Sequence, residues 1–319
     1  MKRLILIPAF SAVLFSQLFI NLSEPLAACT KPSNIPAFDA RAYYQSAQGK
    51  TGDALKSALN KKIKGHKKHS YKCVWDILGE ADQDPNNSDN VILLYMGRSQ
   101  DKSRRDRGTG DNDAWNREHV WAKSHGFPSK SQHGYTDAHH LRPSDKSVNS
   151  ARGNKDFGEG GDSHHECSQC TSSPDFWGPP KVTRGDVARM IFYMATRYEG
   201  SDQSRTPDLE VVDSSTSGSG PTIGKLCDLY RWHKADPVSQ TEMTRNDVVY
   251  SWQGNRNPFI DHPEFVKSIW GDQCQDTAPE PEDIDPSMNE LIQAIINLLE
   301  TKGVMTKDEI FQEIQRLRN

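Results

Sequence analysis

Three short polar blocks between residues 116 and 154 constrain this chain more than any other part of its sequence. They read Asn-Arg-Glu-His-Val-Trp (116–121), Asp-Ala-His-His-Leu-Arg-Pro (137–143) and Ser-Val-Asn-Ser-Ala-Arg-Gly-Asn (147–154). Taken singly, their residues have ordinary structural explanations: Glu118 as a surface carboxylate of a strand, or Asn149 as an amide on a helix surface. As an ordered set together with His119, they indicate a functional site.

The alternation of side chains over residues 115–121 predicts a β-strand. In a straight strand the adjacent Glu118 and His119 point to opposite faces, so they should not both bind one metal ion. This favours one of them as a metal ligand and the other as a base. Both can reach one phosphate group only if the strand ends or bulges at this point.

These side chains match the requirements for hydrolysing a phosphodiester bond. A water molecule must lose a proton, charge on the phosphorus oxygens must be neutralised, and the leaving oxygen must be stabilised. A neutral histidine suits the first task because its pKa lies near the working pH. A hard cation such as Mg²⁺ suits the other two and prefers oxygen ligands, which Glu118 and Asn149 offer. Arg152 offers a fixed positive fork for a phosphate group.

Hydrophobic periodicity predicts a mixture of helices and strands around the three blocks. Pro143 blocks backward extension of the helix predicted for the third block, and Gly153 ends that helix. Segments rich in Gly, Ser, Asp and Pro are predicted to be loops. The predicted helices cover residues 51–64, 74–78, 144–152 and 184–198 and a portion up to 232, and the predicted strands cover 91–95 and 115–121. Residues 98–113 are predicted to be a loop or an exposed hairpin, and residues 160–180 and 214–221 are predicted to be loops.

Residues 1–28 are predicted to be an export signal that is removed. A basic start at residues 2–3 precedes an apolar stretch from Leu4 to Ile20, and small residues follow at 27–28. A transmembrane anchor is the alternative, but the stretch is shorter than the roughly 20 residues that a span needs, and polar residues interrupt it. The sequence therefore predicts a secreted protein without a membrane span.

The cysteines also bear on where the protein resides. Residues 26–29 fit the site at which a bacterial lipoprotein is cut and then lipidated, here at Cys29. The chain has six cysteines, an even number that suits an oxidised exported protein, and lipidation would leave an odd count. Free secretion is therefore favoured over a periplasmic protein or a lipoprotein, while the pairing of the cysteines stays open.

A Cys-x-x-Cys pair, Cys167 and Cys170, follows His164 and His165 closely in the sequence. Thiolate and imidazole groups suit Zn²⁺, so the pair raises the question of a zinc site. In an exported protein a disulfide within the pair, or with other cysteines, is favoured over zinc.

The charge is negative overall but unevenly distributed. The net charge of −4 counts against a nucleic-acid-binding protein, which is usually basic. Basic residues gather at 61–68 and 102–107, however, and acidic residues gather at 280–285. Basic runs are more often solvated faces than binding sites. Residues 252–259 form a polar and aromatic cluster that either contacts substrate or makes a rigid structural loop.

The C-terminal part of the chain looks separate from the rest. Residues 276–286 are acidic and contain proline, which indicates a linker. Residues 287–319 carry two apolar helical stripes, and Thr306 with Glu309 makes a capping box for the second helix. This helical hairpin is either a docking or self-associating element or the last piece of the fold, and no protein partner is evident.

The three blocks, in this order, resemble those of the bacterial endonuclease I family, which includes secreted DNases and ribonucleases. The likeness extends from about residue 43 to about residue 270, and residues 84–98, 184–200 and 253–264 are also similar. A catalytic domain is therefore expected over residues 29–275. One departure is that the interval from Glu118 to Asn149 is shorter than in enterobacterial and vibrio members, so their substrate preference and disulfides do not transfer.

The resemblance implies a fold and a role for each residue. It implies an α+β domain that contains a strand–strand–helix (ββα-metal) finger, besides the C-terminal helical tail. Glu118 and Asn149 would bind a single Mg²⁺, with Mn²⁺ or Ca²⁺ as alternatives. His119 would be the general base, leaving 5′-phosphate ends. His139 would support the phosphate, and Arg152 would hold it.

The sequence therefore predicts a secreted endonuclease that cuts DNA or RNA with little regard for sequence, because no recognition helix or finger motif is present. Preference between DNA and RNA stays open. One alternative is a zinc hydrolase using His119, His139 and His140, although the chain has no His-Glu-x-x-His helix. The other is a non-catalytic nucleic-acid-binding module, which would not need a base beside metal ligands.

Overall fold

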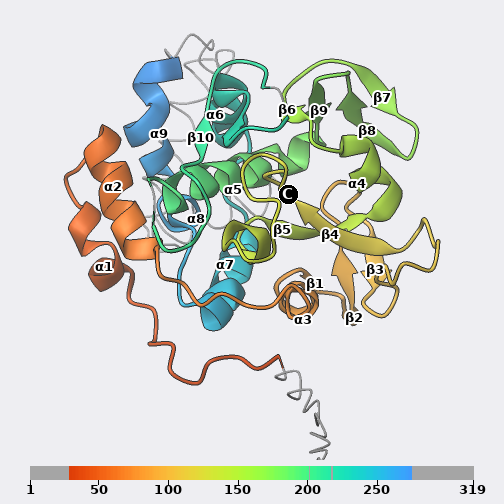
Figure 1. Cartoon of the computed structure of the whole chain (residues 1–319), viewed down its shortest axis with the longest axis horizontal. Coiled ribbons are helices and arrows are strands. Elements are labelled where there is room, and N and C mark those ends of the chain that lie inside the picture. Colours follow the sequence, from red (N-terminus) through yellow and green to blue (C-terminus); the bar gives the residue numbers. More distant parts are fainter. Residues whose placement is uncertain (1–28, 201, 217, 275–319) are drawn as a thin grey trace, which may run out of the picture. The chain divides into compact units, whose positions relative to one another are not determined.

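The computed structural model describes residues 29–200, 202–216 and 218–274. The predicted signal (1–28), acidic linker (276–286) and helical hairpin (287–319) lie outside the described residues. The compact unit that holds the described elements begins at Lys31. It combines helices with several small, separate sheets, which confirms the predicted α+β class (Figure 1).

Helix α5 (Arg184–Arg197) forms the centre of the hydrophobic core. Every residue from Val187 to Arg197 is buried, because helices pack around α5 on several sides (Figure 1). Fully burying one large aliphatic side chain stabilises a fold by about 1.5–3 kcal/mol, so α5 is the main scaffold of the domain. Its neighbours are α2 (Gly52–Ile63), α6 (Leu226–Ala235) and α8 (Pro258–Asp261), and α9 (Glu264–Trp270) packs on α2.

Another pair of helices packs side by side. Helix α3 (Val74–Ala81) packs against α7 (Gln240–Gln253), and a short α1 (Ala40–Tyr43) precedes α2. Helix α7 was not predicted, although its start carries a clear local signal: Ser239 and Glu242 form a capping box.

The strands form small sheets. One has the order β1 (Gln83–Asp84), β2 (Asn87–Ile92), β3 (Ser99–Asp101). Another consists of β4 (Trp115–His119) and β5 (Leu141–Asp145). The largest has the order β6 (Asp156–Phe157), β9 (Phe176–Gly178), β8 (Cys167–Ser172), β7 (Asp162–His164), and β10 (Glu210–Val211) pairs with β11 (Thr222–Ile223).

Strand β5, which pairs with β4, leads directly into helix α4 (Lys146–Arg152). The strands are antiparallel, with Trp115 opposite Asp145 and His119 opposite Leu141. Asp145 ends β5 and also caps α4, since its Oδ1 accepts the backbone N–H of Ser147 at 3.0 Å. The predicted helix therefore starts two residues later than expected. Helix α4 packs on both strands, so the first and third polar blocks face each other.

Two predictions about local structure were wrong. The apolar run 91–95 is not a strand throughout, because β2 ends at Ile92 and Gly97, with φ +61°, turns the chain back into β3. The polar segment 160–180 is not a loop but contains β7, β8 and β9. Its strands are mostly polar on their exposed side, so the hydrophobic alternation that marks a strand is weak there.

Every cysteine among the described residues is part of a disulfide. Cys167 pairs with Cys170 within β8, and Cys227 at the start of α6 pairs with Cys274. The first confirms the disulfide interpretation of the Cys-x-x-Cys pair over the zinc interpretation. Among the described helices, none combines the length and apolar character needed to cross a bilayer.

Candidate active site

A solvent-open cavity of about 590 Å³ gathers four of the five predicted site residues: Glu118, His119, Asn149 and Arg152. They come from the end of β4 and from α4, which the β4–β5–α4 arrangement brings together. Strand β4 ends at His119, as expected if adjacent residues are to reach one ligand. The rest of the wall includes Tyr71, Trp75, Asp106, Asn116, Arg117 and Lys123.

The carboxylate of Glu118 is held in one orientation. Its side chain is only 2% exposed, and its Oε1 accepts a hydrogen bond of 2.7 Å from the hydroxyl of Tyr95. The same oxygen lies 3.4 Å from Nη1 of Arg152. Burial raises the pKa of Glu118, while Arg152 and the Tyr95 hydroxyl act against that rise.

The imidazole of His119 is oriented by the backbone. Its Nε2 lies 3.0 Å from the carbonyl oxygen of Tyr135, which can only accept a hydrogen bond. Nε2 must therefore carry the proton, and Nδ1 is left as the acceptor. Burial, and to a lesser degree the nearby His140, hold the pKa of His119 well below its ordinary value, so the ring is neutral near pH 7.

Asn149 presents its amide from the middle of α4. Its Nδ2 donates a 2.7 Å hydrogen bond to Oδ1 of Asn116 on β4. This contact crosses from the helix to the strand and engages the nitrogen end of the Asn149 amide. The Asn149 oxygen is thereby the end that is free to bind a further group.

Arg152 is buried rather than presented to solvent. Its guanidinium donates to the carbonyl oxygens of Val120 at 2.8 Å and His119 at 3.1 Å, besides facing Glu118. Its side chain is 1% exposed. The Arg152 guanidinium therefore holds the end of β4 and the Glu118 carboxylate in place.

His139 lies outside the cavity. It is buried, its Nε2 lies 3.0 Å from the carbonyl oxygen of Asn255, and its ring packs against Tyr193. Burial lowers the pKa of His139 to about 4. Residues 252–259 are equally internal: Arg256, for example, is paired with Asp261 at 2.7 Å. These residues hold the fold together and do not line the cavity.

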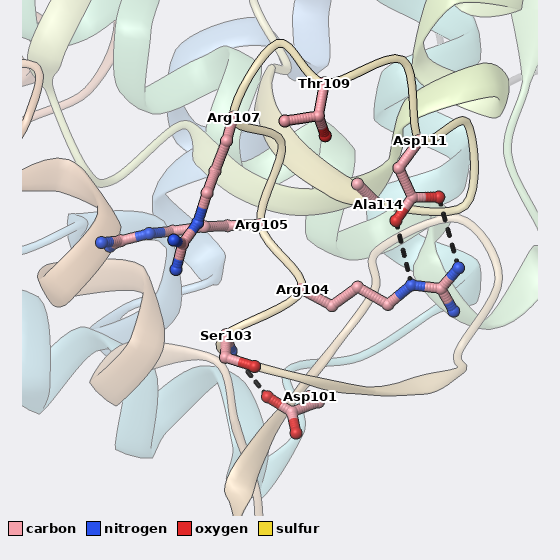
Figure 2. Close-up of a pocket in the computed structure, with 8 residues that line it drawn as sticks. All are labelled: Asp101, Ser103, Arg104, Arg105, Arg107, Thr109, Asp111 and Ala114. Atoms are coloured by element: carbon pink, nitrogen blue, oxygen red, sulfur yellow. Dashed lines mark hydrogen bonds and ion pairs between the residues drawn. The ribbon is translucent and has the colours of Figure 1, made fainter.

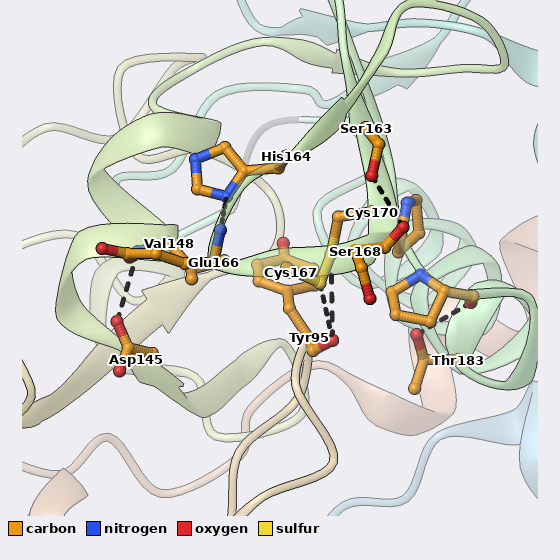
Figure 3. Close-up of a disulfide and its surroundings, with 12 residues drawn as sticks. Tyr95, Asp145, Val148, Ser163, His164, Glu166, Cys167, Ser168, Cys170 and Thr183 are labelled. Carbon is orange, nitrogen blue, oxygen red and sulfur yellow. Dashed lines mark hydrogen bonds between the residues drawn. A yellow bond between two sulfur atoms is a disulfide. The ribbon is translucent and has the colours of Figure 1, made fainter.

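Tyr95 is a site residue that the sequence analysis missed. Its hydroxyl reaches Glu118, and its carbonyl oxygen lies 3.2 Å from Sγ of Cys167 in the disulfide (Figure 3). It follows the end of β2, far from the three polar blocks in sequence. Nothing in local spacing marks a tyrosine there, because tertiary contacts bring its ring to Glu118: Leu94 donates its N–H to the Pro143 carbonyl of β5 at 2.9 Å, and the disulfide of β8 contacts the Tyr95 carbonyl.

The cavity lies within the part of the chain that matches a known family. The endonuclease I family model matches residues 51–264, which include every residue that lines the cavity. The chain belongs to the endonuclease I family.

Relatives of this endonuclease I family member differ in their named substrates. The chain is 52% identical to an extracellular ribonuclease of Bacillus amyloliquefaciens over 236 residues, which cover 74% of this chain and 80% of the relative. An extracellular ribonuclease of Bacillus subtilis strain 168 is 51% identical over 236 residues, again 74% of this chain and 80% of the relative. An extracellular deoxyribonuclease of Aeromonas hydrophila is 29% identical over 130 residues, 39% of this chain and 49% of the relative.

The oxygen donors of the cavity suit a hard cation. Within the described part of the chain, no group of three or more His, Cys, Asp or Glu side chains is arranged to hold a metal. Glu118 and Asn149, however, offer one carboxylate and one amide oxygen, and both side chains are already oriented by hydrogen bonds. A pair of oxygen ligands completed by water is how proteins commonly bind Mg²⁺. The residues of this family member therefore fit such an ion.

A second cavity, of about 400 Å³, lies in the loop that precedes β4 (Figure 2). It is lined by Arg104, Arg105 and Arg107 together with Asp101 and Asp111, and it contains no histidine. It therefore has no neutral base of the kind found at His119, and the larger cavity is the candidate active site of this family member.

Proposed function

We propose that this protein is a secreted endonuclease, largely indifferent to sequence, that hydrolyses phosphodiester bonds of RNA and DNA with one divalent metal ion. The observation that carries the proposal is that Glu118, Asn149 and His119 share one solvent-open cavity. In it a base with an unoccupied acceptor nitrogen stands beside two oriented oxygen ligands.

RNA is the first substrate to test. Two relatives of about half identity are named ribonucleases, and a more distant one is named a deoxyribonuclease. Secretion is supported by the predicted signal in residues 1–28, by the disulfides, and by the word extracellular in those relatives' names.

In this proposal Glu118 and Asn149 hold the metal ion, with Mg²⁺ as the expected species and Mn²⁺ or Ca²⁺ as substitutes. When bound, such a cation neutralises charge on the phosphate oxygens and stabilises the leaving oxygen. Tyr95 and Arg152 fix the Glu118 carboxylate, so that it need not reorganise when it meets the ion.

His119 acts as the general base. Its Nδ1 takes a proton from a water molecule, the water oxygen attacks phosphorus, and the bond from phosphorus to the 3′ oxygen breaks. The 3′ oxygen takes up a proton from solvent, so the products carry a 5′-phosphate and a 3′-hydroxyl. The Tyr135 carbonyl keeps Nε2 protonated and so keeps Nδ1 available for this step.

Arg152 and His139 take roles different from those expected from the sequence. Because Arg152 is buried on backbone carbonyls, we assign it the positioning of Glu118 and of the strand end, and not contact with the phosphate. Because His139 is buried outside the cavity, we assign it a structural role in the core.

The test is digestion of plasmid DNA and of RNA with Mg²⁺, with and without EDTA, by wild type, His119→Ala and the control His165→Ala. His165 has an 80% exposed side chain and lies outside the cavity, so its loss should leave cutting unchanged. EDTA and His119→Ala should each abolish cutting, and added imidazole should partly restore His119→Ala. Full activity in EDTA, or in His119→Ala, would refute the proposal.

Calorimetry separates the roles of the two neighbouring residues. Glu118→Ala should weaken Mg²⁺ binding more than His119→Ala, because only the carboxylate is assigned as a ligand. The reverse order would overturn this assignment.

A further inference from the structure

Arg117 is a cation of the catalytic cavity that no ion pair neutralises within the described part of the chain. Its guanidinium carbon lies 3.4 Å from the ring centre of Tyr71 and 4.0 Å from that of Trp75. Its Nη1 donates to the Tyr71 carbonyl, while its Nε is buried without a partner. Its charge therefore has no carboxylate partner among the described residues and its Nε has no acceptor, so an anion in the cavity would compensate both.

Trp75 connects this arginine to the second cavity. The guanidinium of Arg105 lies 5.7 Å from the Trp75 ring centre, so the same indole faces Arg117 and Arg105. The indole is part-exposed and is braced edge-on by the buried Trp115. Arg105 lines the second cavity and the next residue, Asp106, lines the catalytic one, so the two cavities adjoin at Trp75.

The three arginines of the second cavity differ in how far they are neutralised. Arg104 is paired with Asp111 at 3.1 Å and with Asp113 at 3.2 Å. Figure 2 shows Arg105 and Arg107 pointing away from Asp111. Arg105 has only a long contact of 4.0 Å with the exposed Asp76, and Arg107 is exposed with no ion pair to any described residue.

We propose that one strand of the polynucleotide leaves the catalytic cavity, crosses Trp75 and enters the second cavity. Arg117 binds the phosphate beside the bond that is cut, and Arg105 and Arg107 bind the phosphates that follow. Trp75 stacks on the base between them. This inference rests on the proposed function. It adds that the preferred substrate is an unpaired strand that extends beyond the two nucleotides joined by the cleaved bond.

An unpaired strand is favoured for a physical reason. A tryptophan ring can stack only on the open face of a base, and in a duplex the neighbouring bases cover both faces. Single-stranded RNA, RNA loops and single-stranded DNA therefore use Trp75, whereas an intact duplex contacts only the arginines. This gives a preference for nucleic acid form without any preference for sequence.

The test is equilibrium binding of a fluorescent oligonucleotide to the full chain in EDTA, so that no cutting is needed. We compare wild type, the double variant Arg105→Gln/Arg107→Gln and the control Arg104→Gln. Arg104 serves as the control because its charge is already paired with Asp111 and Asp113. For an oligonucleotide of about ten residues, two lost phosphate contacts should flatten the slope of log affinity against log salt by about 1.4. The control should keep the wild-type slope, and binding of a dinucleotide should be the same in all three.

Trp75 is tested separately with single-stranded and duplex oligonucleotides of one sequence. Trp75→Leu should weaken single-strand binding about tenfold and leave duplex binding unchanged, while Trp75→Phe should keep most of the affinity. Melting temperatures identify any variant that fails to fold, and Trp75→Phe then decides the question.

A wild-type salt slope in the double variant, or an equal loss in Arg104→Gln, would overturn the proposed path. Equal loss of single-strand and duplex binding in Trp75→Leu would overturn the stacking role. Failure of the proposed function would instead appear as absence of metal-dependent cutting by wild type, which this binding assay does not involve.

Discussion

Removing one hydroxyl group, in Tyr95→Phe, tests how the site holds Glu118, the proposed metal ligand. The hydroxyl donates a buried hydrogen bond of 2.7 Å to Oε1 of Glu118. The variant keeps the aromatic ring, which packs edge-on against Trp177, and it keeps the backbone that contacts the disulfide. The change is therefore confined to the support of the Glu118 carboxylate.

The expected magnitude follows from the two groups that share Oε1. A hydrogen bond to a charged group contributes about 1.5–3 kcal/mol. Arg152 stays 3.4 Å from the same oxygen and retains part of the support, so we expect a loss at the low end, about 1.5 kcal/mol. That corresponds to roughly tenfold weaker metal binding, and it agrees with the 10–100-fold usual for residues that orient metal ligands.

The measurement is the affinity for Mg²⁺ by calorimetry, together with the Mg²⁺ dependence of cutting. Tyr198→Phe is the matched control, because its hydroxyl also donates to a buried carboxylate, Asp137, at 3.0 Å but outside the cavity. The control should lose stability without losing metal affinity. Unchanged affinity in Tyr95→Phe, or an equal loss in Tyr198→Phe, would refute the supporting role of Tyr95.

Three further predictions concern stability. Replacing Cys227 by Ser opens the disulfide to Cys274, 47 residues away, and should lower the free energy of unfolding in denaturant titration by about 4 kcal/mol. Burial lowers the pKa values of His139 and His140 from 6.5 to about 4, so the unfolded state binds more protons than the folded state between these two pH values. The free energy of unfolding should therefore fall as pH falls through this window, by on the order of 2 kcal/mol per histidine. A comparison of the melting temperature at pH 7 and pH 4.5 measures this loss. Ser239→Ala removes the cap of α7 and should cost about 1 kcal/mol in the same titration.

Periodicity in the sequence was enough to predict the helices of the core. The apolar spacing over 51–64 and 184–198 corresponds closely to α2 and α5, because an amphipathic helix needs only local repetition to be recognised. Strands β7, β8 and β9 were missed because they carry no such repetition. They are short, and the side chains of β7 and β8 are mostly polar, so backbone pairing holds these strands together without a clear hydrophobic alternation.

The ordered blocks were also enough to select Glu118, His119 and Asn149, and the structure brings all three to one cavity. The same reasoning could not separate Arg152 from Arg117. Both are arginines in polar blocks, and only their surroundings differ. Arg152 is enclosed by backbone carbonyls, whereas Arg117 is stacked on aromatic rings without a carboxylate.

What the sequence determined by itself is the set of reactive groups, since residue identity fixes which atoms can bind a metal ion, accept a proton or carry charge. What only the tertiary structure decided is the orientation and the protonation of each group. Burial, the Tyr95 hydroxyl and the Tyr135 carbonyl set orientation and pKa, and these come from residues distant in the chain. Electrostatic and hydrogen-bond effects depend on separation in space, which spacing along the chain does not specify.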